Sequence, residues 1–427
     1  MARSLAQWLE WQQHQHPRAI DLGLDRVRSV AERMGLLPLR VPAAIVAGTN
    51  GKGSTATTLA SMLSAAGLRI GLFTSPHLVR YNERIQLNGR PVDDASLCAA
   101  FERIADCAGD VSLTFFEFNT LAALEVFARS AAQVIVLEVG LGGRLDATNI
   151  VDADVAVLCS VGMDHTDWLG DSLELIGREK AGVFRAAQRV VLGTSALPAS
   201  VFEIATAQRC AARVADEDFG WSVHPDGTWR YDLRGPSTAQ LESLPAPRLT
   251  GEIQYRNAAT ALTAWYALHE ARPEAVPVPR VSTVHEGLLR VSLPGRMQML
   301  SRGAEWVLDV AHNVPAAEIF ASALRKRGPV RRTIAIFGML GDKDISGVVR
   351  ILDGLVDEWW LCPTADGRGL DAAQLALRMG STRGEQRHFA SVEEASAQAL
   401  TAGSADERVL VCGSFHVVGP ALRCLGL

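Results

Sequence analysis

The chain reads AIVAGTNGKGST at residues 44–55, and this stretch decides its fold. An apolar run with strand character leads into a glycine-rich turn that carries Lys52, and a helix-compatible segment from about residue 54 to 66 follows, with Gly67 at its C-cap. Such a turn lets backbone N–H groups converge on phosphate oxygens, while the helix N-terminus and the lysine supply positive charge. The spelling departs from G-x-x-x-x-G-K-[ST], because Gly53 follows the lysine. An ordinary strand-to-helix turn is the alternative, but the flanking elements favour nucleotide binding.

The composition is typical of a globular enzyme. The 427 residues suggest two or three domains, and 48% of them are hydrophobic while 21% are charged. A formal net charge of −5 argues against a nucleic-acid partner. The N-terminus lacks an apolar signal core, and no later run reaches membrane-spanning length, so no membrane partner is expected. The seven cysteines are dispersed and odd in number, which favours reduced thiols and a cytoplasmic location.

Short apolar runs alternate with helical patterns through the first two thirds of the chain. The runs are nearly continuous, which is typical of parallel strands covered on both faces. The predicted strands are 43–47, 70–74, 134–139, 155–161 and 190–193, and the predicted helices are 93–107, 117–131 and 173–181. A β-hairpin region is expected at about 216–247, followed by a helix at 257–268.

The alternation restarts after the join at residues 293–295, which read LPG. The predicted strands of this second region are 305–310, 333–338, 358–362 and 409–412, and the predicted helices are 315–326, 345–355 and one at the C-terminus. We therefore expect two α/β domains, 1–293 and 294–427, with a cleft between them. Ligands in open parallel sheets bind beyond the carboxyl ends of the strands.

Polar side chains follow several of the predicted strands. Glu138 closes one strand, Asp164 and His165 follow another, and Ser75 and His77 follow a third. Because the carboxyl ends of parallel strands lie at one edge of a sheet, these groups should converge beside the phosphate-binding turn. Individually Glu138 could form a strand-end salt bridge and His165 could cap a helix. Together they indicate Mg²⁺ held jointly by protein and triphosphate.

Longer motifs give the chain a family resemblance. It resembles folylpolyglutamate synthase/dihydrofolate synthase, a branch of the Mur-ligase superfamily, over nearly its whole length. The matching motifs, besides the phosphate-binding turn, are TSPHL (74–78), NERI (82–85), EVGLGGRLDATN (138–149), EKAG (179–182), PGR (294–296), DVAHN (309–313), GDKD (341–344) and GSF (413–415). Two positions depart, since Ile253 stands where the family usually has histidine and Val314 where it usually has proline.

The resemblance implies the fold and the reaction. The fold is a two-domain Mur-ligase-like α/β architecture, with an N-terminal P-loop ATPase-type parallel-sheet domain and a smaller C-terminal Rossmann-like domain. The reaction is ATP-dependent amide ligation in folate biosynthesis. A carboxylate of dihydropteroate or a reduced folate attacks the γ-phosphate, and the amino group of L-glutamate then displaces phosphate from the acyl phosphate. We expect both synthase activities, ATP as co-substrate, Mg²⁺ at two sites, and a monomer.

The resemblance also implies residue roles. The ATP-binding set is Asn50, Gly51, Lys52, Gly53, Ser54, Thr55, Asn257, Arg296, Asp309 and His312. The catalytic set is Lys52, His165, Lys180 and Arg296, with Arg296 acting on the transferred phosphoryl group. The pterin-binding set is Arg84, Thr114, Phe116 and Asp146. Incoming glutamate is expected to contact Ser414 and His416, although a strand-end turn is a simpler account of that pair.

Lys180 is unusual in the implied metal-binding set, which is Ser75, Glu138, His165 and Lys180. An ammonium cannot donate a lone pair to a metal. At about 4 Å and an effective dielectric constant near 20, Mg²⁺ beside Lys⁺ would cost on the order of 8 kcal/mol. A carbamate formed with CO₂ reverses the sign of that interaction, so we predict that Lys180 is carbamylated. A plain surface lysine is the alternative.

Two other functions compete with the folate ligase. A cell-wall ligase of the same superfamily would add an amino acid to a nucleotide-linked precursor, but the TSPHL motif and the early position of the phosphate-binding turn argue against it. A nucleotide-dependent switch without ligase chemistry would not need Asp309 and His312 in the second domain, nor the Glu138, His165 and Lys180 cluster.

Overall fold

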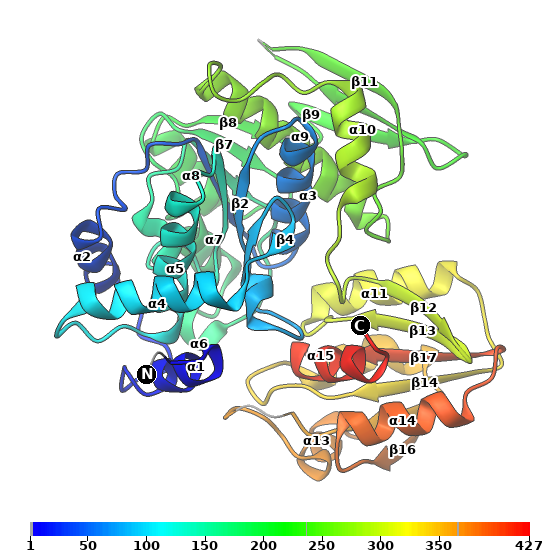
Figure 1. Ribbon diagram of the computed structural model, residues 1–427. Helices are drawn as coiled ribbons and strands as arrows, with labels where there is room; N and C mark the ends of the chain where they lie inside the picture. The colour runs from blue at the N-terminus through cyan, green and yellow to red at the C-terminus, as the bar shows by residue number, and fades with distance from the viewer. Residues whose placement is uncertain (1–2, 236, 365–366) are drawn as a thin grey trace.

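The computed structural model describes residues 3–235, 237–364 and 367–427, which form two parts (Figure 1). The N-terminal part runs from α1 (Leu5–Gln13) to α10 (Val281–Arg290), and the C-terminal part runs from β12 (Gln298–Arg302) to α15 (Phe415–Cys424). Each part is built around its own largely parallel sheet. The segment between α10 and β12 contains the join at residues 293–295.

An eight-stranded sheet forms the centre of the N-terminal part, in the order β4-β3-β2-β5-β1-β6-β7-β8. The strands from β2 to β8 in this order are parallel, and β3 and β4 extend one edge in antiparallel fashion. Every residue of β1, β2, β5 and β6 is buried, as expected for strands covered on both faces. The bounds are Ala43–Ala47 (β1), Ile70–Phe73 (β2), Ile85–Leu87 (β3), Arg90–Pro91 (β4), Val134–Glu138 (β5), Val155–Leu158 (β6), Arg189–Leu192 (β7) and Ala211–Val214 (β8).

Helices cover both faces of this sheet. On one face α3, α9 and α10 bury their apolar side chains, and on the other α1, α2, α4, α5 and α8 do so. The short helix α6 and helix α7 connect β6 to β7. The bounds are Asp25–Arg33 (α2), Lys52–Ala65 (α3), Asp94–Ala108 (α4), Phe115–Arg129 (α5), Thr166–Leu169 (α6), Leu173–Ala181 (α7), Ala199–Ala207 (α8) and Ile253–Ala271 (α9).

The predicted hairpin region forms a small antiparallel sheet of three strands, β9 (Phe219–Val223), β10 (Trp229–Leu233) and β11 (Ala239–Leu244). Alternate residues of β10 are buried, which is the pattern of a strand with one face on the core. The Tyr231 hydroxyl lies 2.9 Å from Thr263 Oγ1 on α9, and this contact ties the small sheet to the main body.

The C-terminal part has a six-stranded sheet in the order β12-β13-β17-β14-β15-β16, parallel except for β12. Helices α11, α12 and α13 pack on one face, and α14 and α15 pack on the other. The strand bounds are Ala304–Asp309 (β13), Arg332–Phe337 (β14), Glu358–Leu361 (β15), Glu385–His388 (β16) and Glu407–Cys412 (β17). The helix bounds are Val314–Lys326 (α11), Ile345–Leu352 (α12), Ala372–Met379 (α13) and Val392–Ala402 (α14).

The predicted parallel strands are confirmed, with small shifts at their ends. Three predicted helices begin two or more residues earlier in the structure, α3 at Lys52, α5 at Phe115 and α9 at Ile253. In α5 the reason is a capping box, in which the Thr114 hydroxyl accepts the Glu117 N–H and the Glu117 carboxylate accepts the Thr114 N–H. The helices that were not among the predicted elements are α1, α2, α6, α8, α10, α13 and α14.

The register brings four strand ends together. Val46 of β1 pairs with Glu138 of β5, Ala47 of β1 pairs with Leu158 of β6, and Phe73 of β2 pairs with Leu137 of β5. The loops that follow β1, β2, β5 and β6 therefore leave the sheet side by side. Among the residues that the structure describes, no helix has the length and apolar character needed to cross a membrane.

Candidate active site

A cavity of about 1890 Å³ lies where the two parts meet. Its lining comes from the loops after β1, β2, β5 and β6 of the first sheet and after β13, β14 and β17 of the second. Pockets for one drug-sized ligand are about 300–1,000 Å³, so this volume leaves room for several substrates at once. The chain contains four lysines, and all of them line this cavity: Lys52, Lys180, Lys326 and Lys343.

The predicted phosphate-binding turn connects β1 to α3. Gly51 is the N-cap of α3 with φ 89°, a left-handed conformation that a side chain would strain. A Cβ at Gly51 would also lie 3.0 Å from Asn257 Oδ1, so Asn257 of α9 lies against the turn. Lys52 Nζ donates to the carbonyl oxygens of Gly48 and Thr49, at 3.0 and 3.2 Å. The turn therefore presents an ammonium group and a helix N-terminus to the cavity.

Glu138, at the end of β5, is a buried carboxylate beside the turn. Its Oε2 accepts the Ser75 N–H at 3.0 Å. A Cβ added to Gly53 would lie 3.5 Å from both carboxylate oxygens, so Glu138 lies against the first turn of α3. Burial raises the pKa of Glu138, and the charge of Lys52 and the Ser75 hydrogen bond oppose that rise. A carboxylate and a serine hydroxyl are hard oxygen donors, which suit Mg²⁺.

Lys180, near the end of α7, is almost completely buried. Its Nζ donates to the Gly48 carbonyl oxygen at 3.0 Å, the same oxygen that accepts from Lys52. Burial, with the charge of Lys52 as the second cause, lowers the pKa of Lys180 to about 7. The Lys180 amine is therefore held against the phosphate-binding turn.

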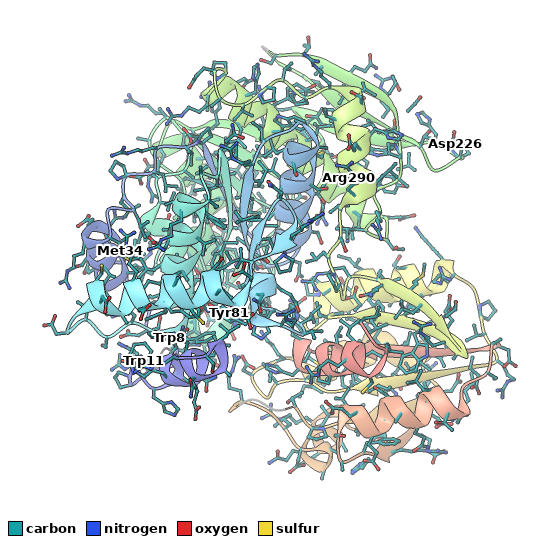
Figure 2. The ribbon with its side chains drawn as sticks, viewed as in Figure 1. Trp8, Trp11, Met34, Tyr81, Asp226 and Arg290 are labelled. Atoms are coloured by element: carbon teal, nitrogen blue, oxygen red, sulfur yellow. The ribbon has the colours of Figure 1, made fainter. Side chains whose placement is uncertain are left out.

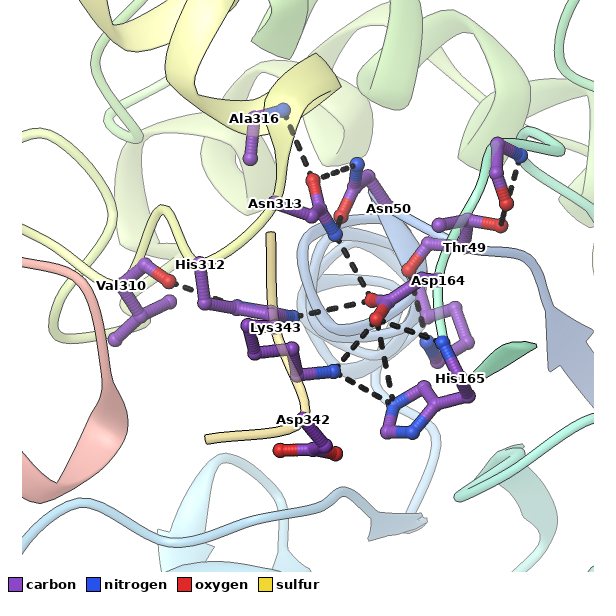
Figure 3. A network of polar contacts seen from close by, with 12 residues as sticks. Thr49, Asn50, Asp164, His165, Val310, His312, Asn313, Ala316, Asp342 and Lys343 are labelled. Atoms are coloured by element: carbon purple, nitrogen blue, oxygen red, sulfur yellow. Dashed lines mark hydrogen bonds and ion pairs between the residues drawn. The ribbon is translucent and has the colours of Figure 1, made fainter. Parts of the chain in front are cut away.

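A polar network joins the two parts around Asp164 (Figure 3). Lys343 Nζ lies 2.5 Å from Asp164 Oδ1, Asn313 Nδ2 donates to Oδ2 at 2.9 Å, and His312 Nε2 lies 3.4 Å from Oδ2. Asn313 also exchanges side-chain hydrogen bonds with Asn50 of the phosphate-binding turn. The pKa of Asp164 lies below its usual range. Burial alone would raise it, but the hydrogen bond and charge of His312, together with the other nearby cationic side chains, lower it more strongly.

His165 adjoins this network at the N-cap of α6. Its backbone is left-handed, with φ 52°, which is uncommon for a residue other than glycine and recurs at functional sites. Burial lowers the pKa of His165 to about 4, so the ring is neutral at physiological pH. His165, Lys180 and Glu138 all line the cavity into which the phosphate-binding turn opens.

Arg296 and Asp309 face the cavity from the second part. The Arg296 guanidinium lies 5.3 Å above the Phe415 ring, and its Nη1 donates to the Gly295 carbonyl oxygen at 3.2 Å. Within residues 3–235, 237–364 and 367–427 it forms no ion pair with a carboxylate. Asp309 accepts the N–H groups of Met297 and Ala311, at 2.8 and 2.9 Å. Asp309 thus fixes the loop that carries Arg296, and the guanidinium is left available to an anion.

The four predicted pterin residues lie at two depths. Arg84 lines the cavity, and its Nε donates to His77 Nδ1 at 2.8 Å. Phe116 packs under Gly140, where a Cβ would come within 2.5 Å of the ring. Asp146 accepts the N–H groups of Gly140 and Leu141 together with two groups of Thr148. Thr114, Phe116 and Asp146 therefore support the wall, and the neighbouring Phe115, Gly140 and Leu141 form its surface.

The two predicted glutamate residues lie where β17 passes into α15. Both line the cavity. The Ser414 hydroxyl also accepts the His416 N–H at 3.2 Å and caps α15, which agrees with the simpler account of a strand-end turn. Among the described residues there is no group of three or more histidine, cysteine, aspartate or glutamate side chains that could hold a metal ion. A metal at Ser75, Glu138 and His165 would need a further ligand from Lys180 or a phosphate.

Comparison with known proteins agrees with this geometry. The Mur ligase middle domain matches residues 46–194, and the Mur ligase, glutamate ligase domain matches residues 295–415. The dihydrofolate synthase/folylpolyglutamate synthase of Escherichia coli strain K12 is 41% identical over 425 residues, which cover 99% of this chain and 96% of the relative. The chain belongs to the dihydrofolate synthase/folylpolyglutamate synthase family.

Two solved structures of the family superpose over 100% of this chain and 98% of the other. The Escherichia coli protein in complex with DHPP and ADP has a TM-score of 0.91 at 41% identity. A bifunctional folylpolyglutamate synthase/dihydrofolate synthase with Mn, AMPPNP and L-glutamate bound has a TM-score of 0.89 at 42% identity. The predicted Mur-ligase fold and the predicted class, an ATP-dependent glutamate ligase of folate metabolism, are confirmed.

Sequence reasoning left several cavity residues of this family member without a role. Asn313 and Lys343 stand in the quoted motifs, and their position after predicted strands could have indicated that they face the cleft. Asp164 was placed at a strand end beside the phosphate-binding turn, but its partners from the second part were not predicted. Arg256, one residue before Asn257, also lines the cavity. Gln12 carried no signal, because a glutamine in an N-terminal helix is typical of a solvated surface.

Replacing Lys343 by methionine is expected to loosen the contact between the two parts. Lys343 and Asp164 come from different parts, and each side chain is only 7% exposed. Removing one partner of a buried ion pair costs about 3 kcal/mol or more, and here that cost disfavours the closed arrangement. Small-angle X-ray scattering of the ligand-free variant should give a larger radius of gyration.

The matched control is Lys326→Met. Lys326 pairs with Glu252, which also joins the two parts, but both side chains are exposed and such pairs contribute about 0–1 kcal/mol. Equal scattering profiles for wild type and Lys343→Met would contradict the role given to the Asp164 network.

Proposed function

We propose that this chain joins L-glutamate both to dihydropteroate and to reduced folates, with ATP supplying the leaving group through an acyl phosphate. The observation that carries the proposal is the single cavity into which the phosphate-binding turn, the Glu138 region and the loops of the second sheet all open. A carboxylate is a poor acylating agent, so phosphorylation and shielding from water are the two things the site must provide.

The residue roles follow the charges of the site. We assign the nucleotide to residues 50–55 with Asn257, Arg296, Asp309 and His312, all of which border the cavity or the turn. Phosphoryl transfer depends on positioning and charge neutralisation more than on a side-chain nucleophile. Lys52 supplies positive charge from the first part and Arg296 from the second, so the transferred group would be neutralised only when both parts face it.

We assign Mg²⁺ to Ser75 and Glu138, and a second ion to Glu138, His165 and Lys180 as its carbamate. The donor set fits such ions, because it offers a buried carboxylate, a hydroxyl and a neutral imidazole around a triphosphate site. When bound, the ions would offset the negative charge of the phosphates. The division of the chain into domains 1–293 and 294–427 also remains our proposal. In this division the ligation reaction takes place in the cavity between the two domains.

The pterin substrate is assigned to the end of the cavity bordered by Arg84 and Phe115, over the support that Thr114, Phe116 and Asp146 provide. Incoming glutamate is assigned to Ser414 and His416 at the end of β17. This arrangement would place the carboxylate of the pterin substrate between the nucleotide and the amino group of glutamate.

One assay tests the proposed function. Purified protein with ATP and Mg²⁺ is given dihydropteroate plus glutamate, tetrahydrofolate plus glutamate, or a cell-wall precursor with its amino acid, and ADP release is measured. We expect release in the first two arms, dependent on both substrates. ADP release that requires neither pterin substrate would overturn the proposal, and release only in the third arm would favour the cell-wall ligase.

A further inference from the structure

Gln12, in the last turn of α1, is a buried glutamine whose side chain has no hydrogen-bond partner. The residue is 1% exposed, and neither its Oε1 nor its Nε2 has a partner. Other buried polar atoms without a partner occur in the part of the chain that the structure describes, but those residues do not line the cavity, whereas Gln12 does. Buried amide groups are normally hydrogen-bonded, because leaving them unpaired costs stability.

The helix that carries Gln12 is firmly held. It begins with a capping box between Ser4 and Gln7. Trp8 packs against Phe101 of α4 with ring centroids 6.1 Å apart, and Trp11 packs against Phe118 of α5 at 5.8 Å. Figure 2 shows Trp8 and Trp11 where α1 lies beside α4. The Gln12 backbone, one residue after Trp11, is therefore fixed, and its side chain borders the cavity. A polar group on a rigid element is how binding sites achieve precise placement.

The location of Gln12 indicates which substrate it meets. Helix α1 packs on α4 and α5, and the first residue of α5, Phe115, lines the same cavity. The Arg84 guanidinium lies 5.6 Å above the Phe115 ring. Gln12 thus belongs to the wall near Arg84 and Phe115, the end that we assign to the pterin.

The chemistry of the side chain narrows the ligand further. A carboxamide offers one acceptor oxygen and two N–H donors side by side, so it complements a group that presents a donor next to an acceptor. The lactam edge of a pterin, N3–H beside C4=O, is such a group, whereas a phosphate or a carboxylate presents acceptors alone. We propose that the Gln12 side chain binds the lactam edge of the pterin ring through a pair of hydrogen bonds. The inference rests on the proposed function.

The test compares Gln12→Leu with Gln15→Leu. Gln15 lies just past α1, and its Nε2 donates to the Trp11 carbonyl oxygen at 3.4 Å. Because Gln15 does not line the cavity, Gln15→Leu is the same substitution of glutamine by leucine away from the site. Dihydropteroate binding is titrated by fluorescence quenching with ADP present. Gln12→Leu should weaken dihydropteroate binding about 10- to 100-fold and leave ADP binding unchanged, while Gln15→Leu changes neither. The affinity of Gln12→Leu for pterin-6-carboxylate, which lacks the p-aminobenzoyl arm, should fall below that of the wild type by the same factor.

Thermal unfolding of the ligand-free variants separates recognition from a structural role. Because Gln12→Leu removes an unpaired buried amide, its Tm should rise by on the order of 2 °C. A raised Tm with unchanged dihydropteroate binding would overturn the inference and leave the proposed function standing. Wild-type protein that does not bind dihydropteroate would overturn both. If leucine prevents folding, Gln12→Met keeps the length of the side chain and gives the same readouts.

Discussion

Replacing Lys180 by methionine is expected to lower the rate of ADP formation by about 10³-fold or more, because the exchange removes a ligand from the assigned metal site. Lys180 is buried beside Lys52, and both ammonium groups share the Gly48 carbonyl oxygen. Two ammonium groups and a divalent ion cannot be close together at low cost. A carbamate at Lys180 would turn one of these repulsions into an attraction.

Lys180→Arg distinguishes the carbamate from a plain cation. Arginine keeps the positive charge but does not form a carbamate, so we expect it to be as inactive as methionine. Lys180→Ala should regain part of its activity when a short carboxylate such as acetate is added. Lys326→Met serves as the control, since that exposed lysine lies at the edge of the cavity and should retain activity.

The modification itself can be observed without an activity assay. Protein equilibrated with ¹³C-labelled bicarbonate should show one carbamate carbon by NMR in the wild type and none in Lys180→Met. An unmodified, fully active Lys180 in the metal-loaded enzyme, or an active Lys180→Arg variant, would contradict the carbamate.

Replacing Arg296 by alanine is expected to lower kcat by about 10³-fold while changing the affinity for ADP much less. The guanidinium has no carboxylate partner within ion-pair distance in the described part of the chain. It lies over the Phe415 ring, and both residues line the cavity. It is therefore free to meet charge that develops on the transferred phosphoryl group. Single-turnover measurements would separate this step from product release.

Two comparisons sharpen the Arg296 prediction. Arg296→Lys keeps the charge without the planar fork, so it should recover only part of the rate. Arg302→Ala removes an exposed arginine from the neighbouring strand β12 and should behave like wild type. If Arg296→Ala raised the KM for ATP with kcat unchanged, Arg296 would be a ground-state binding residue instead.

Much of the fold could be predicted because its elements are local. The parallel strands appear as continuous apolar runs, and the turn at residues 48–53 has a glycine pattern that few other structures require. Elements without such patterns were missed. Helix α1 is short and rich in glutamine, and α10 is recognisable mainly by its packing on α3.

Of the site, the residue types at strand ends could be predicted, but their partners could not. Nothing local to Asp164 indicates that Lys343 will lie 2.5 Å away, since the two residues are far apart along the chain. Likewise, the sequence predicts Asp146 as a carboxylate that binds the pterin. In the structure its Oδ2 accepts the N–H groups of Gly140 and Leu141 and so holds the loop after β5.

The amino-acid sequence by itself determined the parallel sheets, the phosphate-binding turn and the family, because periodicity and glycine placement act over a few residues. Only the tertiary structure decided which charges are buried together, that Arg296 has no carboxylate ion-pair partner among the described residues, and that the Gln12 side chain lines the cavity without a hydrogen bond. The reason is physical: hydrogen-bond satisfaction and desolvation depend on every group that packs around an atom, and those groups come from distant segments of the chain.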